Sequence, residues 1–405
     1  MAVGKSIWPD VQPVQGFKLG VAKAGIKHKD RRDLVVMHCD ERASVAAVFT
    51  QNRFCAAPVL ISQERLSQKP CYFVINTGNA NAGTGEQGLK DARHITATLA
   101  EQVNVSPNRI MPFSTGVIGE RLPVDTLCAG LPQALADLSE NHWHQAAEGI
   151  MTTDSRPKGS CRQFQVDSIT YTVSGISKGA GMIKPNMATM LAFIATDAAV
   201  DNAFLQKMLS DIANQSFNRI SIDGDTSTND SCLLVATGAR KNNPVNGSGG
   251  MLEEKLTQAV REVAVELAQA IVRDGEGATK YVSVKVEQAA SSADALEVAY
   301  TIAHSPLVKT ALFASDPNWG RLLAAVGRAD INELLIDRVS IWLDEVAIVT
   351  HGEPDPGYTE AAGQQVMNQE EITVRISLGA GDCSEEIWTT DLSHEYVKIN
   401  AEYRT

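Results

Sequence analysis

Four short segments of the sequence bring hydroxyl or charged side chains together, three of them beside glycine. Hydroxyl groups supply nucleophiles and hydrogen-bond donors, while lysine and glutamate can pair with the charges of a substrate. Glycine adopts positive φ easily and lets backbone N–H groups approach a ligand closely. Each segment alone is equally typical of a tight turn. They are residues 113–119 (FSTGVIG), 151–154 (MTTD), 178–182 (KGAGM) and 273–280 (RDGEGATK).

The third segment continues into a longer stretch that differs in kind, residues 178–193 (KGAGMIKPNMATMLAF). Glycines and Pro185 precede a peptide bond between two small residues, Ala188 and Thr189, and an apolar run follows. Composition alone favours a buried strand position for Thr189, because β-branched residues fit strands well.

Several standard motifs are absent from the sequence. There is no GxGxxG after a strand, no GxxxxGK[ST], no HExxH and no GxSxG. His28 lies between two lysines and is expected to face solvent. Residues 223–230 (DGDTSTND) resemble a calcium loop, but Leu234 stands where the ligating glutamate belongs. We therefore predict no metal site and no cofactor, and interpret residues 223–230 as a polar loop near the site.

The apolar pattern predicts a mixture of strands and helices. Strands are expected at residues 35–37, 46–48, 72–75 and 371–376, and a loop at residues 76–83. Apolar residues three or four apart predict helices at 91–103 and 252–271, and Asp201 is a candidate N-cap. Several strands look hairpin-connected rather than joined by crossover helices. The predicted fold is α/β, a layered sandwich with central β-sheets flanked by helices.

The composition and net charge argue against some classes of binding partner. The chain has 405 residues, of which 44% are hydrophobic and 21% charged, and its formal net charge is −12. That charge argues against nucleic acid and anionic membranes as partners, since a basic face is the usual footprint. Seven cysteines form no CxxC pair, and the N-terminal residues lack the apolar core of a signal peptide. A cytoplasmic protein is expected.

Residues 178–191 (KGAGMIKPNMATML) resemble the self-processing motif of the ornithine acetyltransferase family, the glutamate N-acetyltransferases of arginine biosynthesis. Further similar blocks run in family order along the chain: VINTGNANAGTG, MPFSTGVIGE, IMTTDSRPK, SIDGDTSTND, IVRDGEGATK, FASDPNWGR and DLSHEYVKINAEYRT. One local departure is Ser155, where the family pattern suggests threonine.

The resemblance implies that the chain cuts itself between Ala188 and Thr189. Residues 1–188 would form an α chain and residues 189–405 a β chain, and two such pairs would assemble into an α2β2 tetramer. The architecture would resemble that of amino-terminal-nucleophile enzymes. Cleavage would give Thr189 a free α-amino group, which has a reference pKa of roughly 7.7–8.0 and can act as the base for its own hydroxyl.

The resemblance also implies a ping-pong reaction and the residues that perform it. Thr189 would accept the acetyl group of N2-acetyl-L-ornithine and pass it to L-glutamate, with Thr115 and Gly116 as the oxyanion hole. Lys178 suits a substrate carboxylate and Glu276 a substrate ammonium. Whether Thr152 or Thr153 contacts the substrate stays open. The implied substrate-binding residues are Thr152 or Thr153, Lys178, Thr189, Glu276, Asn400 and Thr405.

The sequence leaves two alternative functions and the identity of the acyl donor open. An aminopeptidase or amidase of the same fold would pass the acyl group to water, and a non-catalytic protein would only bind amino acids. Acetyl-CoA would be a second acyl donor in a bifunctional enzyme, and no residue in the sequence decides between one donor and two.

Overall fold

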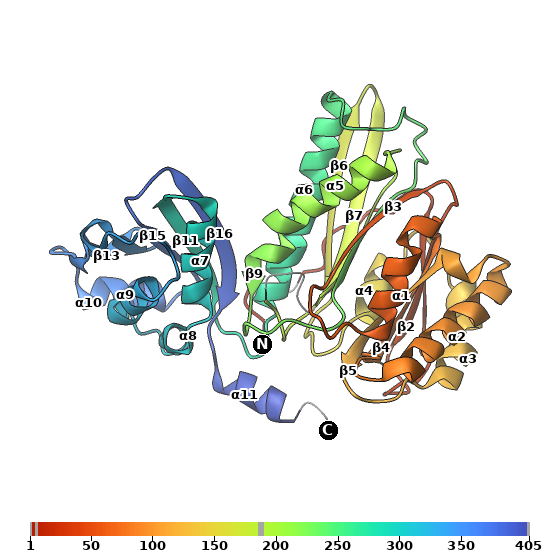
Figure 1. Ribbon diagram of the computed structural model, residues 1–405, viewed down its shortest axis with the longest axis horizontal. Helices are drawn as coiled ribbons and strands as arrows, with labels where there is room; N and C mark the ends of the chain where they lie inside the picture. The colour runs from red at the N-terminus through yellow and green to blue at the C-terminus, as the bar shows by residue number, and fades with distance from the viewer. Residues whose placement is uncertain (1, 5–6, 185–189, 403–405) are drawn as a thin grey trace.

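The computed structural model describes residues 2–4, 7–184 and 190–402. Within these residues the chain forms three sheets (Figure 1). Two of them stack face to face between layers of helices, and the third lies beyond α6 (Met251–Arg273) with helices of its own. The layered α/β sandwich predicted from the sequence is confirmed.

The first sheet has the strand order β1-β2-β4-β5, in which β4 and β5 are parallel. Leu34 and Val36 of β2 share a core with Leu99 of α2 and Leu131 of α3, so these helices cover the outer face. The elements of this part are β1 (Phe17–Ala22), β2 (Leu34–Cys39), α1 (Ala57–Arg65), η1 (Leu66–Gln68), β4 (Tyr72–Asn79), α2 (Gly85–Val103), η2 (Pro107–Arg109), β5 (Ile110–Val117), α3 (Val124–Ala136) and α4 (Trp143–Gly149).

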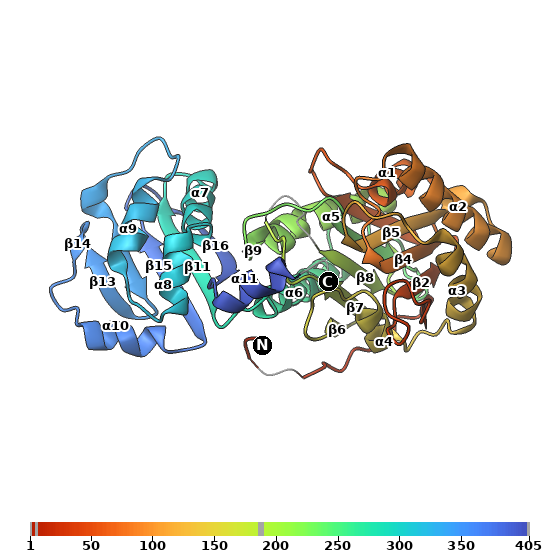
Figure 2. The same cartoon turned by 90° about the horizontal axis from the view of Figure 1, so that it is seen from below.

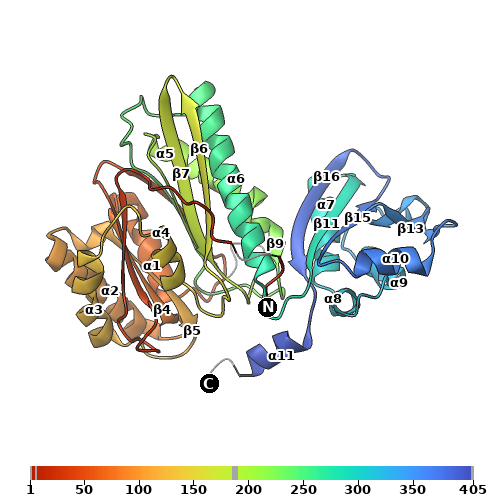
Figure 3. The same cartoon turned by 180° about the vertical axis from the view of Figure 1, so that it is seen from behind.

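The second sheet has the order β3-β10-β8-β7-β6, and α5 and α6 pack on its outer face. Strands β7 and β8 are antiparallel neighbours, whereas β8 and β10 are parallel. Figure 3 shows α6 running along β6 and β7. Its elements are β3 (Ser44–Phe49), β6 (Lys158–Val166), β7 (Ile169–Lys178), β8 (Leu191–Thr196), α5 (Asn202–Gln215), η3 (Phe217–Arg219), β10 (Ser231–Ala236) and α6.

The alternation of strand side chains builds two cores, one on each face of the second sheet. Successive strand residues point to opposite faces, so Phe193 meets the first sheet while Ile194 packs with α5 and α6. Between the two sheets, Val35 and Met37 share the core of Phe193. The rings of Phe113 and Phe193 meet edge to face there, with centroids 5.3 Å apart.

The third sheet has the order β14-β13-β12-β15-β11-β16-β9. Its core includes Val284 of β11, Val298 of α7 and Ile341 of β12. Helix α11 (His394–Ala401) leaves the end of β16 and lies between the third sheet and the other two (Figure 2). The elements are β9 (Ile220–Ser221), β11 (Tyr281–Ala289), α7 (Ser292–Ala303), α8 (Pro306–Phe313), α9 (Trp319–Gly327), η4 (Ile336–Arg338), β12 (Ser340–Leu343), β13 (Val346–Thr350), β14 (Glu353–Pro354), α10 (Glu360–Met367), β15 (Glu371–Ser377) and β16 (Cys383–Thr390).

Most predicted elements are confirmed. The strands expected at residues 35–37, 46–48, 72–75 and 371–376 lie in β2, β3, β4 and β15, and the helix at 252–271 lies in α6. Asp201 caps α5, because its side chain accepts from the amides of Ala203 and Phe204. Within the described residues, no helix combines the length and apolar character needed to cross a bilayer.

Two predictions need correction. The loop expected from Asn76 begins later, because β4 continues to Asn79, and Asn76 is satisfied inside the fold by the Asn79 carbonyl and the Ser114 hydroxyl. The helix expected from Asp91 begins at Gly85, and its first turns contain glycines that carry no apolar pattern. The expectation that several strands are connected by hairpins is confirmed by β6–β7 and β12–β13, whereas β4–β5 and β8–β10 are parallel and joined through α2 and α5.

Candidate active site

A cavity of about 240 Å³ lies where the first two sheets meet the segment after α6 and the end of α11. It collects side chains that are far apart in the sequence, including seven of the residues predicted for the site. Its lining residues are Ala80, Thr115, Gly116, Val117, Ile118, Thr152, Thr153, Lys178, Ala180, Gly181, Met182, Ser227, Thr228, Asn229, Glu276 and Asn400.

Thr115 and Gly116 lie at the end of β5, beside the parallel strand β4. Gly116 has φ +136° and is in register with Gly78, and a Cβ on it would lie 2.2 Å from the Gly78 carbonyl carbon. Only glycine fits this approach. The Asn229 amide donates to the carbonyls of Ala80 and Ser114, at 2.6 and 2.9 Å, and holds the two strand ends together. Gly116 is therefore fixed at the cavity wall.

Lys178 is the last residue of β7, and its side chain is buried at the cavity. Its Nζ donates to Thr152 Oγ1 at 3.1 Å. Burial lowers the pKa of Lys178 from its ordinary value, and the carboxyl groups of Asp154, Asp230 and Glu276 oppose that shift. Thr152 and Thr153 both line the cavity, but Thr152 is the one in contact with Lys178.

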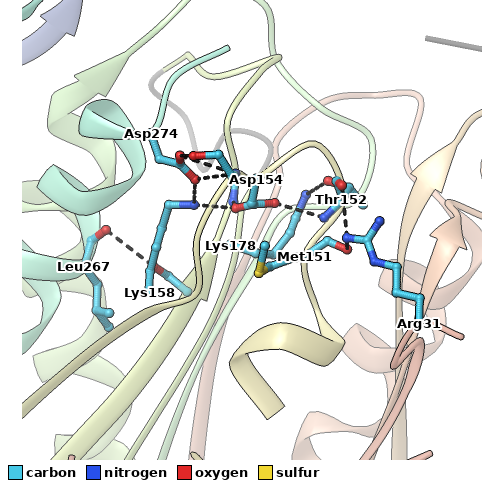
Figure 4. Close-up of polar contacts among 11 residues, drawn as sticks. Arg31, Met151, Thr152, Asp154, Lys158, Lys178, Leu267 and Asp274 are labelled. Atoms are coloured by element: carbon cyan, nitrogen blue, oxygen red, sulfur yellow. Dashed lines mark hydrogen bonds and ion pairs between the residues drawn. The ribbon is translucent and has the colours of Figure 1, made fainter. Parts of the chain in front are cut away.

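Behind Lys178 lies a buried charge network that the sequence reasoning missed (Figure 4). Lys158 Nζ lies 2.5 Å from a carboxylate oxygen of Asp154 and 2.6 Å from one of Asp274, and all three side chains are almost fully buried. Asp154 also accepts from the Gly179 amide at 2.7 Å. The hydroxyl and amide of Ser155 donate to Asp274, so serine performs here what the threonine of the family pattern would also allow.

This network joins three parts of the site: the 151–155 loop, the end of β7 and the end of α6. Burial alone would raise the pKa of Asp154, but the ammonium groups of Lys158 and Lys178 and the Gly179 amide hold it well below its usual range. Asp154 therefore carries its negative charge next to Lys178. The MTTDSRPK and IVRDGEGATK blocks were the available signal, although lysine and aspartate in a sequence usually indicate solvent-facing positions.

Glu276 follows α6 by three residues and is only 9% exposed. Its amide donates to the Ala180 carbonyl at 2.8 Å, and a Cβ on Gly181 would lie 2.5 Å from its carboxyl carbon. Asn400 Nδ2 donates to Glu276 Oε2 at 2.8 Å. The carboxylate is thus held at the cavity beside Gly181, where a substrate ammonium can meet it.

The C-terminal helix α11 reaches the cavity. Asn400 lies near the end of α11 and lines the cavity. The Tyr396 hydroxyl, one turn earlier, donates to Asp223 at 3.2 Å and ties the helix to the polar loop 223–230. Thr405, the other residue expected from this end of the chain, lies outside the described residues.

Ala188 and Thr189 also lie outside the described residues, but the chain is anchored on both sides of them. The Ile183 amide donates to Asp223 at 2.9 Å, and the Met190 amide donates to Asp230 Oδ1 at 2.9 Å. Asp230 is fully buried, and burial raises its pKa well above the ordinary value. The polar loop that the sequence placed near the site thus holds the residues flanking the expected junction.

Most of the predicted site residues line the same cavity. Thr115, Gly116, Thr152, Thr153, Lys178, Glu276 and Asn400 meet at one cavity, and Ala188, Thr189 and Thr405 are not described. The cavity offers an ammonium, a carboxylate and glycine backbone within one enclosure. That arrangement suits a small substrate with charges of both signs.

Two relatives are similar to this chain over its whole length. The arginine biosynthesis bifunctional protein ArgJ of Pseudomonas fluorescens is 60% identical over 405 residues, which is all of both chains. The protein of the same name from Pseudomonas syringae pv. tomato is 57% identical, again over all of both chains.

Solved structures with similar chains are also known. The arginine biosynthesis bifunctional protein argJ of Bacillus halodurans is 36% identical, covers 52% of this chain and 97% of its own, and has a TM-score of 0.49. The ornithine acetyltransferase of Mycobacterium tuberculosis, complexed with ornithine, is 30% identical, covers 45% of this chain and 98% of its own, and has a TM-score of 0.37. A sequence model of the ArgJ family matches residues 18–405. Together with the whole-length relatives, this match shows that the chain belongs to the ArgJ family.

Proposed function

We propose that this protein is an acetyltransferase of arginine biosynthesis that moves the acetyl group of N2-acetyl-L-ornithine to L-glutamate. The observation that carries the proposal is the single cavity that unites Lys178, Glu276, Asn400 and the Thr115–Gly116 strand end. Family membership supports transfer over the aminopeptidase and binding-protein alternatives. We further propose that the protein works in the cytoplasm as an α2β2 tetramer.

The proposed catalyst is made by self-cleavage. Thr189 Oγ attacks the Ala188 carbonyl, the peptide bond is replaced by an ester, and water releases the α chain with its new carboxyl end. Thr189 then has a free α-amine that can take the proton of its own hydroxyl. The hydrogen bonds that anchor Ile183 and Met190, on either side of the proposed junction, support this step.

The transfer itself has two balanced steps. Thr189 Oγ attacks the acetyl carbonyl of acetylornithine, the amide C–N bond breaks, and ornithine leaves with the proton on its amine. The α-amine of glutamate then attacks the acetyl ester, loses a proton and restores the Thr189 hydroxyl. Both steps pass through an oxyanion, which Thr115 and Gly116 would stabilise, and a lost donor typically costs about 10²–10³ in rate.

Lys178 and Glu276 are proposed to bind the substrate charges. The buried ammonium of Lys178 suits the α-carboxylate shared by ornithine and glutamate, because a bound anion offsets the desolvation of that ammonium. Glu276 suits the side-chain ammonium of ornithine. Thr152, already in contact with Lys178, would complete the carboxylate site, and Asn400 would hold Glu276 in place.

The decisive test is an acetyl-transfer assay with glutamate as acceptor and each donor supplied separately. Acetylglutamate should form from acetylornithine, with release of one ornithine per product. Formation from acetyl-CoA as well would identify a bifunctional enzyme. Acetate and ornithine without acetylglutamate would identify the hydrolase instead.

Glu276→Gln should raise KM for acetylornithine roughly tenfold or more, because a hydrogen bond between two charged groups is worth about 1.5–3 kcal/mol. Glutamine can still accept from Asn400, so the site should stay folded. Steady-state kinetics with varied acetylornithine would measure the change. Glu395→Gln, an exposed position on α11, is the control and should behave as the unaltered enzyme. An unchanged KM for Glu276→Gln would remove Glu276 from this assignment.

A further inference from the structure

A second cavity, of about 220 Å³, adjoins the first on the far side of Gly116. The two share Gly116, Val117, Thr152 and Thr153 in their walls. Lys27, His28 and Arg31 line the second cavity but not the first.

The proposed reaction requires a cation away from Glu276, and the second cavity is lined by cations. Ornithine and glutamate must both reach the acetyl group at one nucleophile, yet their side chains end in opposite charges. The carboxylate of Glu276 that attracts the ornithine ammonium repels the side-chain carboxylate of glutamate, and the low exposure of Glu276 strengthens this repulsion. A glutamate bound for transfer needs a cation elsewhere, within reach of the same oxyanion site.

The segment that carries the cavity cations is strongly basic in an acidic chain. Of residues 23–33, five are lysine or arginine and two are aspartate, whereas the whole chain has a net charge of −12. The aspartate that lines the cavity, Asp33, is fully engaged: its two oxygens accept from the amides of Ala24 and Ile26 at 2.7 and 2.6 Å. Its carboxylate therefore stabilises the loop and makes no ion pair with Lys27 or Arg31 among the described residues.

Three hydrogen bonds fix this segment against the 151–155 loop and strand β4. Arg31 Nη2 donates to the carbonyls of Met151 and Thr152, at 2.6 and 3.0 Å, as Figure 4 shows. The Thr77 amide of β4 donates to the Asp33 carbonyl at 2.9 Å. The basic segment is therefore built into the wall that also holds Thr152.

Lys27 packs on β4, beside the strand that carries Gly116. A Cβ on Gly78 would lie 3.3 Å from the Cβ of Lys27, so the lysine packs directly on β4 at Gly78. Gly78 is in register with Gly116 on the neighbouring strand, about 4.8 Å away. Lys27 has no hydrogen bond or ion pair with any described residue, which leaves its ammonium available to a ligand.

We propose that the cavity lined by Lys27 and Arg31 binds the side-chain carboxylate of the acyl acceptor, glutamate. The acceptor would place its α-carboxylate at Lys178 and its α-amine over the acetyl ester, and its side chain would extend past Gly116 to Lys27. Ornithine would turn its side chain the other way, towards Glu276. This inference rests on the proposed function and adds the specificity of its second half-reaction.

The test compares Lys27→Met with Lys29→Met. Both side chains are exposed and both substitutions remove one positive charge from the same loop, but Lys29 does not line the cavity. In a ping-pong enzyme, kcat/KM for each substrate reports its own half-reaction. Lys27→Met should lower kcat/KM for glutamate roughly tenfold or more, as expected for a lost charged hydrogen bond, and leave kcat/KM for acetylornithine unchanged. Lys29→Met should change neither value.

Exchange and binding measurements separate the outcomes further. Exchange of labelled ornithine into acetylornithine needs no glutamate and should persist in Lys27→Met. Calorimetric titration should show weaker glutamate binding and unchanged ornithine binding. Equal losses for both substrates, or an effect confined to acetyl-CoA as donor, would overturn the proposal; the second result would indicate a site for the donor's phosphates. Lys27-dependent glutamate binding without any acetyl transfer by the unaltered protein would instead contradict the proposed function.

Discussion

Replacing Thr189 by alanine is expected to leave a single 405-residue chain that transfers no acetyl group. The hydroxyl is the proposed nucleophile of both the self-cleavage and the transfer, and the α-amine that activates it exists only after the cut. Intact-protein mass spectrometry would measure the first effect, since the unaltered protein should give fragments 1–188 and 189–405. The acetyl-transfer assay with acetylornithine and glutamate would measure the second.

Thr189→Ser is the matched control for this experiment. It keeps a hydroxyl on the same backbone position and removes only a methyl group, so it should still cut itself and retain part of the transfer activity. Circular dichroism should match among the three proteins, which would separate loss of chemistry from loss of fold. Full transfer activity in Thr189→Ala, or fragments with a junction elsewhere, would falsify the assignment.

The sheet topology explains why the two fragments would stay together after such a cut. Strand β7 ends at Lys178 and β8 begins at Leu191, and these two residues are paired in the antiparallel ladder. Strand β3 comes from before the junction and pairs with β10 from after it. Both cores of this sheet therefore contain residues from each fragment. Separation would expose them to water, so the proposed boundary at residue 188 divides the chain without dividing a folding unit.

The elements that could be predicted from the sequence are those whose environment follows a simple repeat. Helix α6 is one, because its apolar residues recur every three or four positions and are buried along its length. The end of β4 is the opposite case: Asn76 and Asn79 resemble turn residues, and only a partner strand and a local carbonyl make them acceptable in a strand. No local pattern contains that information.

The same distinction holds for the site. Lys178, Glu276 and Asn400 were named through the family resemblance, and their assembly at one cavity depends on a fold that joins residues more than two hundred positions apart. The Asp154–Lys158–Asp274 network was missed because burial, which decides its effect, is not visible in the residue types. Lys27 was missed for a related reason, since its position on Gly78 follows from the loop's contacts.

Lys158→Met is expected to destabilise the fold by roughly 3–5 kcal/mol near neutral pH, because it leaves the buried carboxylates of Asp154 and Asp274 without their shared cation. Urea denaturation would measure the difference in unfolding free energy. Arg42→Met is the control: it breaks an ion pair whose arginine is almost fully exposed, and it should have no measurable effect.

The pH dependence should distinguish this mechanism from simple loss of packing. In the unaltered protein the depressed pKa of Asp154 contributes stability that is present above the unfolded value of about 3.9 and is lost as the pH falls through the lower folded value. Without Lys158 the folded-state pKa of Asp154 should rise, because burial is then opposed by one cation fewer. The variant should therefore recover stability relative to the unaltered protein as the pH is lowered from about 7 towards about 4.

A double variant tests whether the loss of stability comes from the stranded charges. Adding Asp274→Asn to Lys158→Met removes one of the two stranded charges, so it should restore part of the lost stability near neutral pH, whereas Asp274→Asn alone should destabilise. A packing defect would instead give losses that add and that do not change with pH. Additive, pH-independent losses would show that the network contributes volume rather than charge, and Asp154 would then need another explanation for its place beside Lys178.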